Sequence, residues 1–134
     1  MRHLYYYAMS GSNASMLLVI VDDDPDTRVI FKVILEKNYP LRNVIATRNG
    51  LECLDVLAKT SFVDPSIVIT DFSMPIMNGI ELKHAIKATY PSIKVILFTA
   101  LPRGENDGFD AVLLKPVNVD DLIDCISKFD GAID

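Results

Sequence analysis

The stretch LLVIVDDD, residues 17–24, decides the fold of this 134-residue chain. Its five consecutive apolar residues predict a strand buried on both faces, which is typical of a parallel sheet covered by helices. Three carboxylates follow that strand directly. Asp24 and Pro25 then predict an N-cap and a first helical position, so the stretch opens a strand–loop–helix unit.

The same alternation of apolar runs and amphipathic stretches continues along the chain. Asn78 with Glu81, and Asn118 with Asp121, have the spacing of capping boxes and mark two further helix starts. A length of 134 residues fits one domain. The pattern predicts an α/β domain with an open, doubly wound parallel sheet and helices on both faces. Strands are predicted at 17–21, 43–46, 67–70, 95–98 and 111–114.

The composition excludes several classes of protein. Apolar residues make up 50% and charged residues 23%, as in ordinary globular domains, which argues against disorder and collagen-like repeats. The net charge of −5 disfavours direct binding of nucleic acid. No apolar run reaches the roughly 18 residues that span a membrane. Cys53 and Cys125 match no metal-ligand spacing and are interpreted as reduced, buried helical thiols, which favours a cytoplasmic location.

The first fifteen residues are set apart from the rest. Residues 10–15 read Ser-Gly-Ser-Asn-Ala-Ser, the composition of a flexible linker. Residues 1–15 are therefore predicted to be an N-terminal tail or an expression remnant, and residues 16–134 to form the domain.

Polar side chains stand where the predicted strands end. Asp22 and Asp23 follow the first strand, Asp71 the third, Thr99 the fourth and Lys115 the fifth. If these strands are neighbours, their carboxyl ends meet at one crevice. Three carboxylates there would repel each other unless a cation or proton neutralised them, and hard oxygen ligands suit Mg²⁺. The added lysine and threonine suit an incoming phosphoryl group. Each residue alone has an ordinary structural explanation, but the combination favours a functional site.

Four motifs together resemble the receiver domain of two-component response regulators, of the chemotaxis-regulator type. They are Val21-Asp22-Asp23, the string DFSMPIMNG at residues 71–79, Thr99-Ala100 and Lys115-Pro116. The resemblance covers residues 16–134. It implies a flavodoxin-like fold with the strand order 2-1-3-4-5.

The resemblance also implies what the strand-end residues do. Asp71 would accept a phosphoryl group from a histidine kinase, a phosphotransfer protein or a small phosphodonor. Lys115 and Thr99 would contact phosphoryl oxygens, and the Lys115-Pro116 peptide bond would be cis. The phosphorylated chain would then change conformation and regulate a downstream protein, promoting its own phosphorylation and dephosphorylation without being an enzyme for another substrate.

The metal ligands follow from the same resemblance. Asp23, Asp71 and the backbone carbonyl of Ser73 would hold Mg²⁺, and Asp22 would act through water. Ser73 and Leu101 also stand where the family varies side chains that influence the attacking water.

The chain departs from the family pattern at two places. Most members carry an aromatic switch residue three positions before the lysine, and here that position is Val112, so the aromatic half of the usual coupling is expected to be absent. Between the fourth and fifth strands, Pro102, Gly104 and Gly108 oppose a helix. The family's fourth helix is therefore expected to be absent or vestigial, and the chain to be a monomer or a non-standard dimer.

Two alternatives stay open at this point. A haloacid-dehalogenase-type phosphatase would also use Thr99, Lys115 and the pair Asp120-Asp121. Its Asp-x-Asp-x-Thr/Val motif is missing after the first strand, however, and it leaves Asp71 unexplained. The other alternative is a receiver-like interaction module that has lost phosphorylation.

Overall fold

The computed structural model describes residues 14–101 and 107–130. Five parallel strands form one sheet in the order β2-β1-β3-β4-β5, which confirms the predicted fold class and strand order. The predicted strand positions are also confirmed, to within one residue at each end. The strands are β1 (Leu17–Val21), β2 (Asn43–Thr47), β3 (Ile67–Asp71), β4 (Lys94–Thr99) and β5 (Ala111–Leu114).

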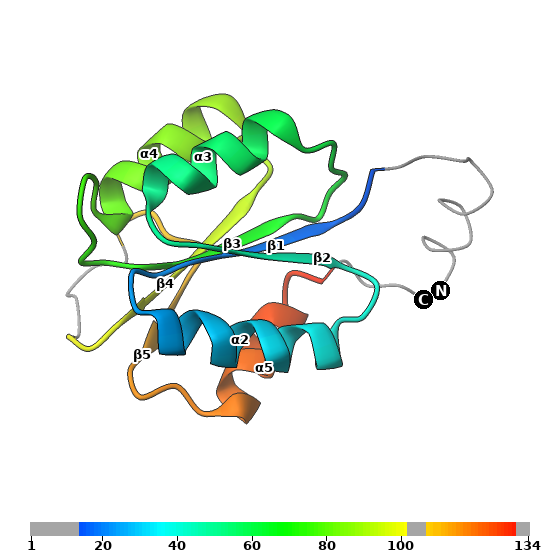
Figure 1. The fold of residues 1–134 in the computed structure, drawn as a ribbon, viewed down its shortest axis with the longest axis vertical. Helices are drawn as coiled ribbons and strands as arrows, with labels where there is room; N and C mark the ends of the chain where they lie inside the picture. The colour runs from blue at the N-terminus through cyan, green and yellow to red at the C-terminus, as the bar shows by residue number, and fades with distance from the viewer. Residues whose placement is uncertain (1–13, 102–106, 131–134) are drawn as a thin grey trace.

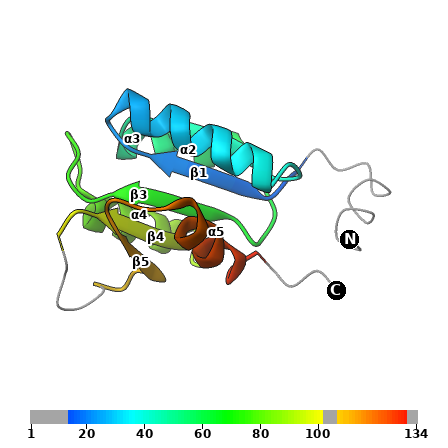
Figure 2. The same cartoon turned by 90° about the horizontal axis from the view of Figure 1, so that it is seen from below.

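Helices cover both faces of the sheet, so the domain has three layers (Figures 1 and 2). The helices α2 (Pro25–Asn38) and α5 (Val119–Ser127) lie on one face, and α3 (Gly50–Lys59) and α4 (Gly79–Thr89) lie on the other. Each pair of helices closes its own apolar cluster against the sheet. The inner strands β1, β3 and β4 are therefore buried from both sides, whereas β5 at the edge is only partly buried.

The interior strand β1, which lies between β2 and β3, shows why a continuous apolar run was required. Successive side chains of a strand point to opposite faces. Leu18 and Ile20 pack in the cluster under α2 and α5, whereas Leu17, Val19 and Val21 pack in the cluster under α3 and α4. All five residues are fully buried. A polar side chain at any of them would have to be desolvated on one face or the other.

The caps predicted from the sequence fix where the helices start. The Asp24 carboxylate accepts hydrogen bonds from the backbone N–H groups of Asp26 and Thr27 at the start of α2. Asn78 and Glu81 form the complete, reciprocal capping box before α4. At α5, the Asp121 carboxylate accepts from the side-chain amide of Asn118, which itself accepts from the Asp121 backbone.

The expectation of a missing fourth helix is not borne out, because the described residues contain four helices. That expectation concerned the segment between β4 and β5, and residues 102–106 of this segment lie outside the described residues. The surface and oligomeric state that were inferred from an absent helix consequently have no support from the fold.

The described residues include the end of the expected N-terminal tail and both cysteines. Ser15 forms an isolated parallel bridge with Phe62, and residues 1–13 of the expected tail lie outside the described residues.

Cys53 and Cys125 are buried free thiols in helices, as predicted. Burial raises the pKa of Cys53 to about 12, so this thiol stays protonated and unreactive. None of the helices within the described residues is long and apolar enough to cross a membrane.

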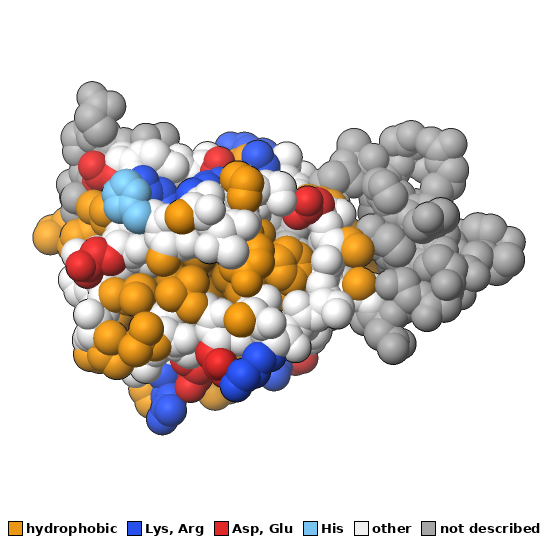
Figure 3. All heavy atoms as spheres, turned by 90° about the horizontal axis from the view of Figure 1, so that it is seen from above, with side chains coloured by type: hydrophobic (Ala, Val, Ile, Leu, Met, Phe, Trp, Pro, Cys, Tyr) orange, Lys and Arg blue, Asp and Glu red, His pale blue; other side chains and the backbone are white. Residues whose placement is uncertain are grey.

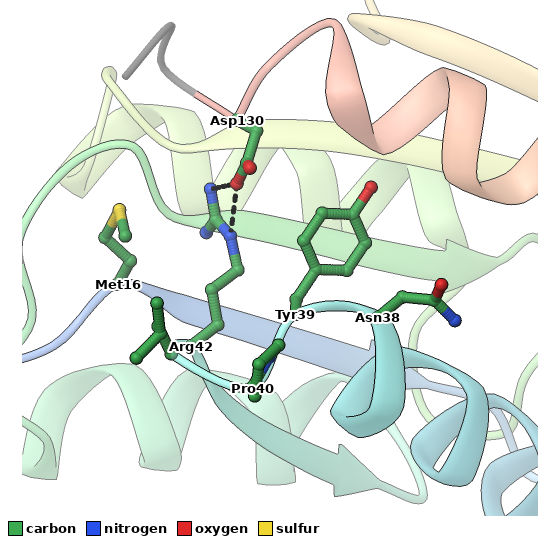
Figure 4. Close-up of a pocket in the computed structure, with 7 residues that line it drawn as sticks. Met16, Asn38, Tyr39, Pro40, Arg42 and Asp130 are labelled. Carbon is green, nitrogen blue, oxygen red and sulfur yellow. Dashed lines mark hydrogen bonds and ion pairs between the residues drawn. The ribbon is translucent and has the colours of Figure 1, made fainter. Parts of the chain in front are cut away.

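A buried arginine clamps the end of the sheet where β1 begins (Figure 4). The Arg42 guanidinium donates to the carbonyl oxygens of Leu17 and Pro65, and its Nε donates to Asp130 Oδ1 at 2.8 Å. Its Nη2 lies 2.7 Å from the same carboxylate oxygen. The arginine side chain is only 2% exposed, and the aspartate side chain is 36% exposed. This clamp ties the chain after α5 to the start of the sheet.

Loss of this partner should destabilise the fold. Asp130→Asn leaves the buried guanidinium without its counter-charge, and we expect the free energy of unfolding to fall by about 1–3 kcal/mol. Asp55→Asn is the matched control, because it breaks the exposed pair of Asp55 with Lys59 and should cost about 0.5 kcal/mol or less. Urea unfolding curves measure both. Equal losses in the two variants would contradict the role given to the clamp.

Candidate functional site

The candidate site lies at the carboxyl edge of the sheet, at the opposite end from the arginine clamp. Strand register aligns Val21 with Thr70, Asp71 with Phe98, and Thr99 with Leu114. The residues that follow these strands are consequently neighbours. In Figure 1 this edge is on the left, where the loops leading into α2 and α4 leave the sheet.

Three acidic residues meet at this edge. The carboxylates of Asp22, Asp23 and Asp71 each offer an oxygen within 4.8 Å of the others. Asp22 is buried, Asp71 is partly buried and Asp23 is exposed. The structure therefore brings together the three carboxylates that the sequence placed at two different strand ends.

The Asp22 carboxylate is held on one side only. Its Oδ1 accepts a hydrogen bond from the Asp24 backbone N–H at 2.8 Å. Its Oδ2 is buried without a hydrogen-bond partner, and the Lys115 Nζ is 3.9 Å away. Burial raises the pKa of Asp22, and the negative charge of Asp71 adds to this, while the Asp24 N–H and Lys115 oppose it. A buried anion with an unsatisfied oxygen favours the arrival of a cation.

Lys115 connects the acidic residues across the sheet. Its Nζ donates to Asp71 Oδ1 at 3.2 Å, and the Phe72 backbone N–H donates to the same oxygen at 2.8 Å. The ammonium group also lies 4.6 Å from the centre of the Phe98 ring, within cation–π range. The Lys115-Pro116 peptide bond is cis, as predicted.

Asp71 and Lys115 share a surface hollow with the predicted hydroxyl group. Thr99 is 6% exposed, and its Oγ1 accepts a hydrogen bond from the Leu101 backbone N–H at 3.3 Å. Since that bond uses a lone pair, the hydroxyl proton is available to a group in the hollow. The lining residues are Asp71, Phe72, Ser73, Thr99, Ala100, Leu101 and Lys115.

The loop from β3 to α4 ends in close contact with the last residue of β3. A Cβ atom on Gly79 would lie 2.8 Å from the Asp71 carbonyl oxygen, so only glycine allows α4 to start there. A Cβ on Gly50 would lie 2.5 Å from Met77, which packs into the space left by that glycine. Ile76 has a φ of 78°, a strained value for a β-branched residue. Packing therefore holds the end of the loop, at Met77 and Gly79, whereas Ser73, Pro75 and Ile76 are exposed.

Two observations bear on the residues outside this cluster. Asp120 and Asp121 are exposed in the first turn of α5 and are not members of the acidic cluster that the described residues form. The phosphatase interpretation, which needs this pair beside Thr99 and Lys115, gains nothing from the structure. Two residues at the site were not predicted from the sequence. They are Phe98, which lies under the lysine, and Arg28, whose Nη1 donates to the Asp22 carbonyl oxygen.

Comparisons with known proteins agree on one family. Residues 18–127 match the family described as the response regulator receiver domain. The chain is 32% identical over 117 residues to the chemotaxis protein CheY of Listeria monocytogenes, covering 83% of this chain and 95% of that protein. It is 28% identical over 118 residues to the transcriptional regulatory protein LnrK of Bacillus subtilis, covering 83% of this chain. It spans only 52% of LnrK, about half of that relative's length.

A solved structure supports the same relationship. The response regulator protein TrrA from Thermotoga maritima, solved in complex with Mg(2+)-BeF, matches with a TM-score of 0.74 and 26% sequence identity. The match covers 84% of this chain and 97% of that chain.

Removing the Asp22 charge should stabilise the metal-free fold. Because the folded-state pKa of Asp22 lies above its ordinary value of 3.8, the native state binds more protons than the unfolded state, and stability falls as pH rises through this interval. At neutral pH, Asp22→Asn removes that penalty, and we expect a higher urea midpoint in EDTA and a flatter pH dependence. Asp26→Asn, an exposed acid in α2, is the control and should not raise the midpoint. A midpoint lowered by Asp22→Asn would contradict the account.

Proposed function

The chain belongs to the response regulator receiver family, and on that premise we propose that Asp71 accepts a phosphoryl group from a phosphohistidine protein. The observation that carries the proposal is the position of the Asp71 carboxylate. It lines a hollow together with Thr99 and Lys115 and stands within the acidic cluster. An attacking carboxylate oxygen forms the new P–O bond while the P–N bond of the phosphohistidine breaks and its nitrogen keeps the electron pair.

The acidic cluster fits a magnesium ion. The buried Asp22 Oδ2 supports this fit, because it has no hydrogen-bond partner and two further carboxylates lie beside it. Asp23, Asp71 and the Ser73 carbonyl would hold the ion, with Asp22 acting through water. Bound Mg²⁺ would neutralise the carboxylates and the incoming phosphoryl oxygens, so that two anions can approach each other. The Mg(2+)-BeF complex of TrrA supports this choice of metal for a relative.

Lys115 and Thr99 act on the phosphoryl oxygens. The lysine Nζ, at 3.2 Å from Asp71 Oδ1, stands where it can shift its contact to an oxygen of the transferred group. The Phe98 ring beneath it limits where the ammonium can go. The free proton of the threonine hydroxyl donates to a second oxygen. Ala100 leaves the hollow open between them.

An apolar surface beside the hollow suits the phosphodonor protein. Val29, Ile30 and Val33 of α2 are 63%, 56% and 60% exposed. A second hollow, lined by Phe31, Ala100 and Pro116 among others, joins this helix to the site. We place the kinase or phosphotransfer protein on this surface, because a donor that presents its phosphohistidine to Asp71 must contact the surface around the hollow. We also propose that the downstream partner binds the phosphorylated form. We propose the cytoplasm as the location of both steps.

Phosphorylation by a small donor tests the acceptor directly. With acetyl phosphate and Mg²⁺, intact-mass spectrometry should show one added phosphoryl group, lost in Asp71→Asn because no carboxylate remains to attack. Lys115→Ala should slow the reaction at least tenfold, in line with the loss of one charged contact to the transferred group. Asp120→Asn is the control for the phosphatase alternative and should be phosphorylated normally. An undiminished label in Asp71→Asn would refute the proposal.

The switch should depend on Thr99 and not on Val112. Thr99 accepts the Lys115 backbone N–H through its carbonyl oxygen at 2.8 Å, so movement of the threonine toward the phosphoryl group would act on β5. Amide hydrogen exchange over residues 107–114 should change on phosphorylation in the wild type and in Val112→Ala. It should stay unchanged in Thr99→Ala. If Val112→Ala abolished the change while Thr99→Ala preserved it, the assignment would be wrong.

A further inference from the structure

The three carboxylates of the acidic cluster are not held equally. The side chain of Asp22 is anchored by the Asp24 backbone N–H, and that of Asp71 by the Phe72 N–H and Lys115. Within residues 14–101 and 107–130, no hydrogen bond or ion pair anchors the Asp23 carboxylate, and the residue is exposed. The Asp23 backbone therefore sets only the direction of the Cα–Cβ bond, from which the carboxylate has to reach the cluster.

Arg28 fixes that backbone. Its Nη1 donates a 2.8 Å hydrogen bond to the Asp22 carbonyl oxygen, in a partly buried position. This carbonyl belongs to the planar peptide unit that carries the Asp23 N–H, so fixing the oxygen fixes the plane from which Asp23 starts. On the other side, the Asp22 N–H donates to the Thr47 carbonyl oxygen of β2 at 3.1 Å. The peptide units on both sides of Asp22 are thus held.

The position of Arg28 in α2 argues for a specific role. Its backbone N–H donates to the Asp24 carbonyl and closes the first turn of the helix. A cation so close to a helix N-terminus is unfavourable, because the N-terminus carries partial positive charge. The side chain turns back toward the acidic loop and makes a charge-assisted bond there, which offsets this cost.

We propose that Arg28 is a positioning residue that aims the Asp23 carboxylate at the metal and thereby sets the affinity for Mg²⁺. The inference rests on the proposed function, because it assumes that the acidic cluster holds the ion. Arginine suits the task, since its planar guanidinium presents donors in a fixed geometry, whereas lysine offers a flexible point charge. Groups that orient metal ligands commonly change metal affinity by about 10–100-fold when they are removed.

Calorimetric titration with MgCl₂ tests the inference. We expect Arg28→Gln to raise the Kd for Mg²⁺ about tenfold. Arg28→Lys keeps the charge but loses the planar guanidinium, and we expect it to raise the Kd about threefold. Lys32→Gln is the matched control, because it removes the same charge one turn further along α2, and it should change the Kd by less than about twofold. The Arg28→Gln effect should persist at high KCl, since a change of geometry is not screened by salt.

Two further measurements distinguish a displaced Asp23 backbone in the Arg28 variants from a loss of fold stability and from a failure of the proposed function. Urea unfolding in EDTA shows whether each variant is folded, and NMR of the metal-free chain should show shifted Asp23 and Asp24 amides in Arg28→Gln. If the wild type binds Mg²⁺ and folded Arg28→Gln binds it equally well, the inference is overturned while the proposed function stands. If Arg28→Gln does not fold, unchanged affinity in Arg28→Lys overturns it. If the wild type itself binds no Mg²⁺, the proposed metal site falls and the inference falls with it.

Discussion

Repulsion among three carboxylates at one edge of the sheet is the constraint on which the rest of the structure depends. Two unit charges about 4 Å apart repel by roughly 4 kcal/mol at an effective dielectric constant of about 20. Lys115 supplies one positive charge to Asp71 at 3.2 Å and lies 3.9 Å from Asp22. One ammonium cannot balance three carboxylates, so the site as folded is short of positive charge. That shortage is the reason why we propose a divalent cation at this edge, since an incoming phosphoryl group is itself an anion and would otherwise be repelled.

The fold keeps the carboxylates together in spite of this repulsion. β1 is fully buried and pairs with β2 on one side and β3 on the other, so the strand that carries Asp22 and Asp23 cannot move aside. The start of α4 packs so closely on the Asp71 backbone that only a glycine fits at position 79. Stability provided by the two apolar clusters is in this way used to maintain an unfavourable arrangement of charge. Strain and charge repulsion at functional sites are commonly maintained in this manner.

The sequence predicted the features that depend on local pattern. Apolar runs predicted all five strands, and the residues after them predicted which polar groups share an edge. The cap at Asp24 and the capping box at Asn78 were also predicted, because caps involve residues two or three positions apart.

The contact of Arg42 with Asp130 was not predicted from the sequence, because it joins residues 88 positions apart and depends on tertiary packing. The same holds for Met77 against Gly50, and for Phe98 beneath Lys115. Arg28 left one faint signal, a cation in the first turn of a helix. The expectation of a missing helix was drawn from the short segment between β4 and β5 and from Pro102, Gly104 and Gly108 within it, and local propensity does not decide how many helices a domain contains.

We propose that the carboxyl edge of the sheet binds Mg²⁺ and presents Asp71 to phosphorus. A crystal structure of the chain with Mg²⁺ and beryllium fluoride, the ligands named for the Thermotoga relative, tests it most directly. We expect density joined to an Asp71 carboxylate oxygen and a cation in contact with Asp23, Asp71 and the Ser73 carbonyl. Lys115 and Thr99 should contact the fluorine atoms. A cation bound elsewhere, or an Asp71 carboxylate left free while both ligands are present in excess, would contradict it.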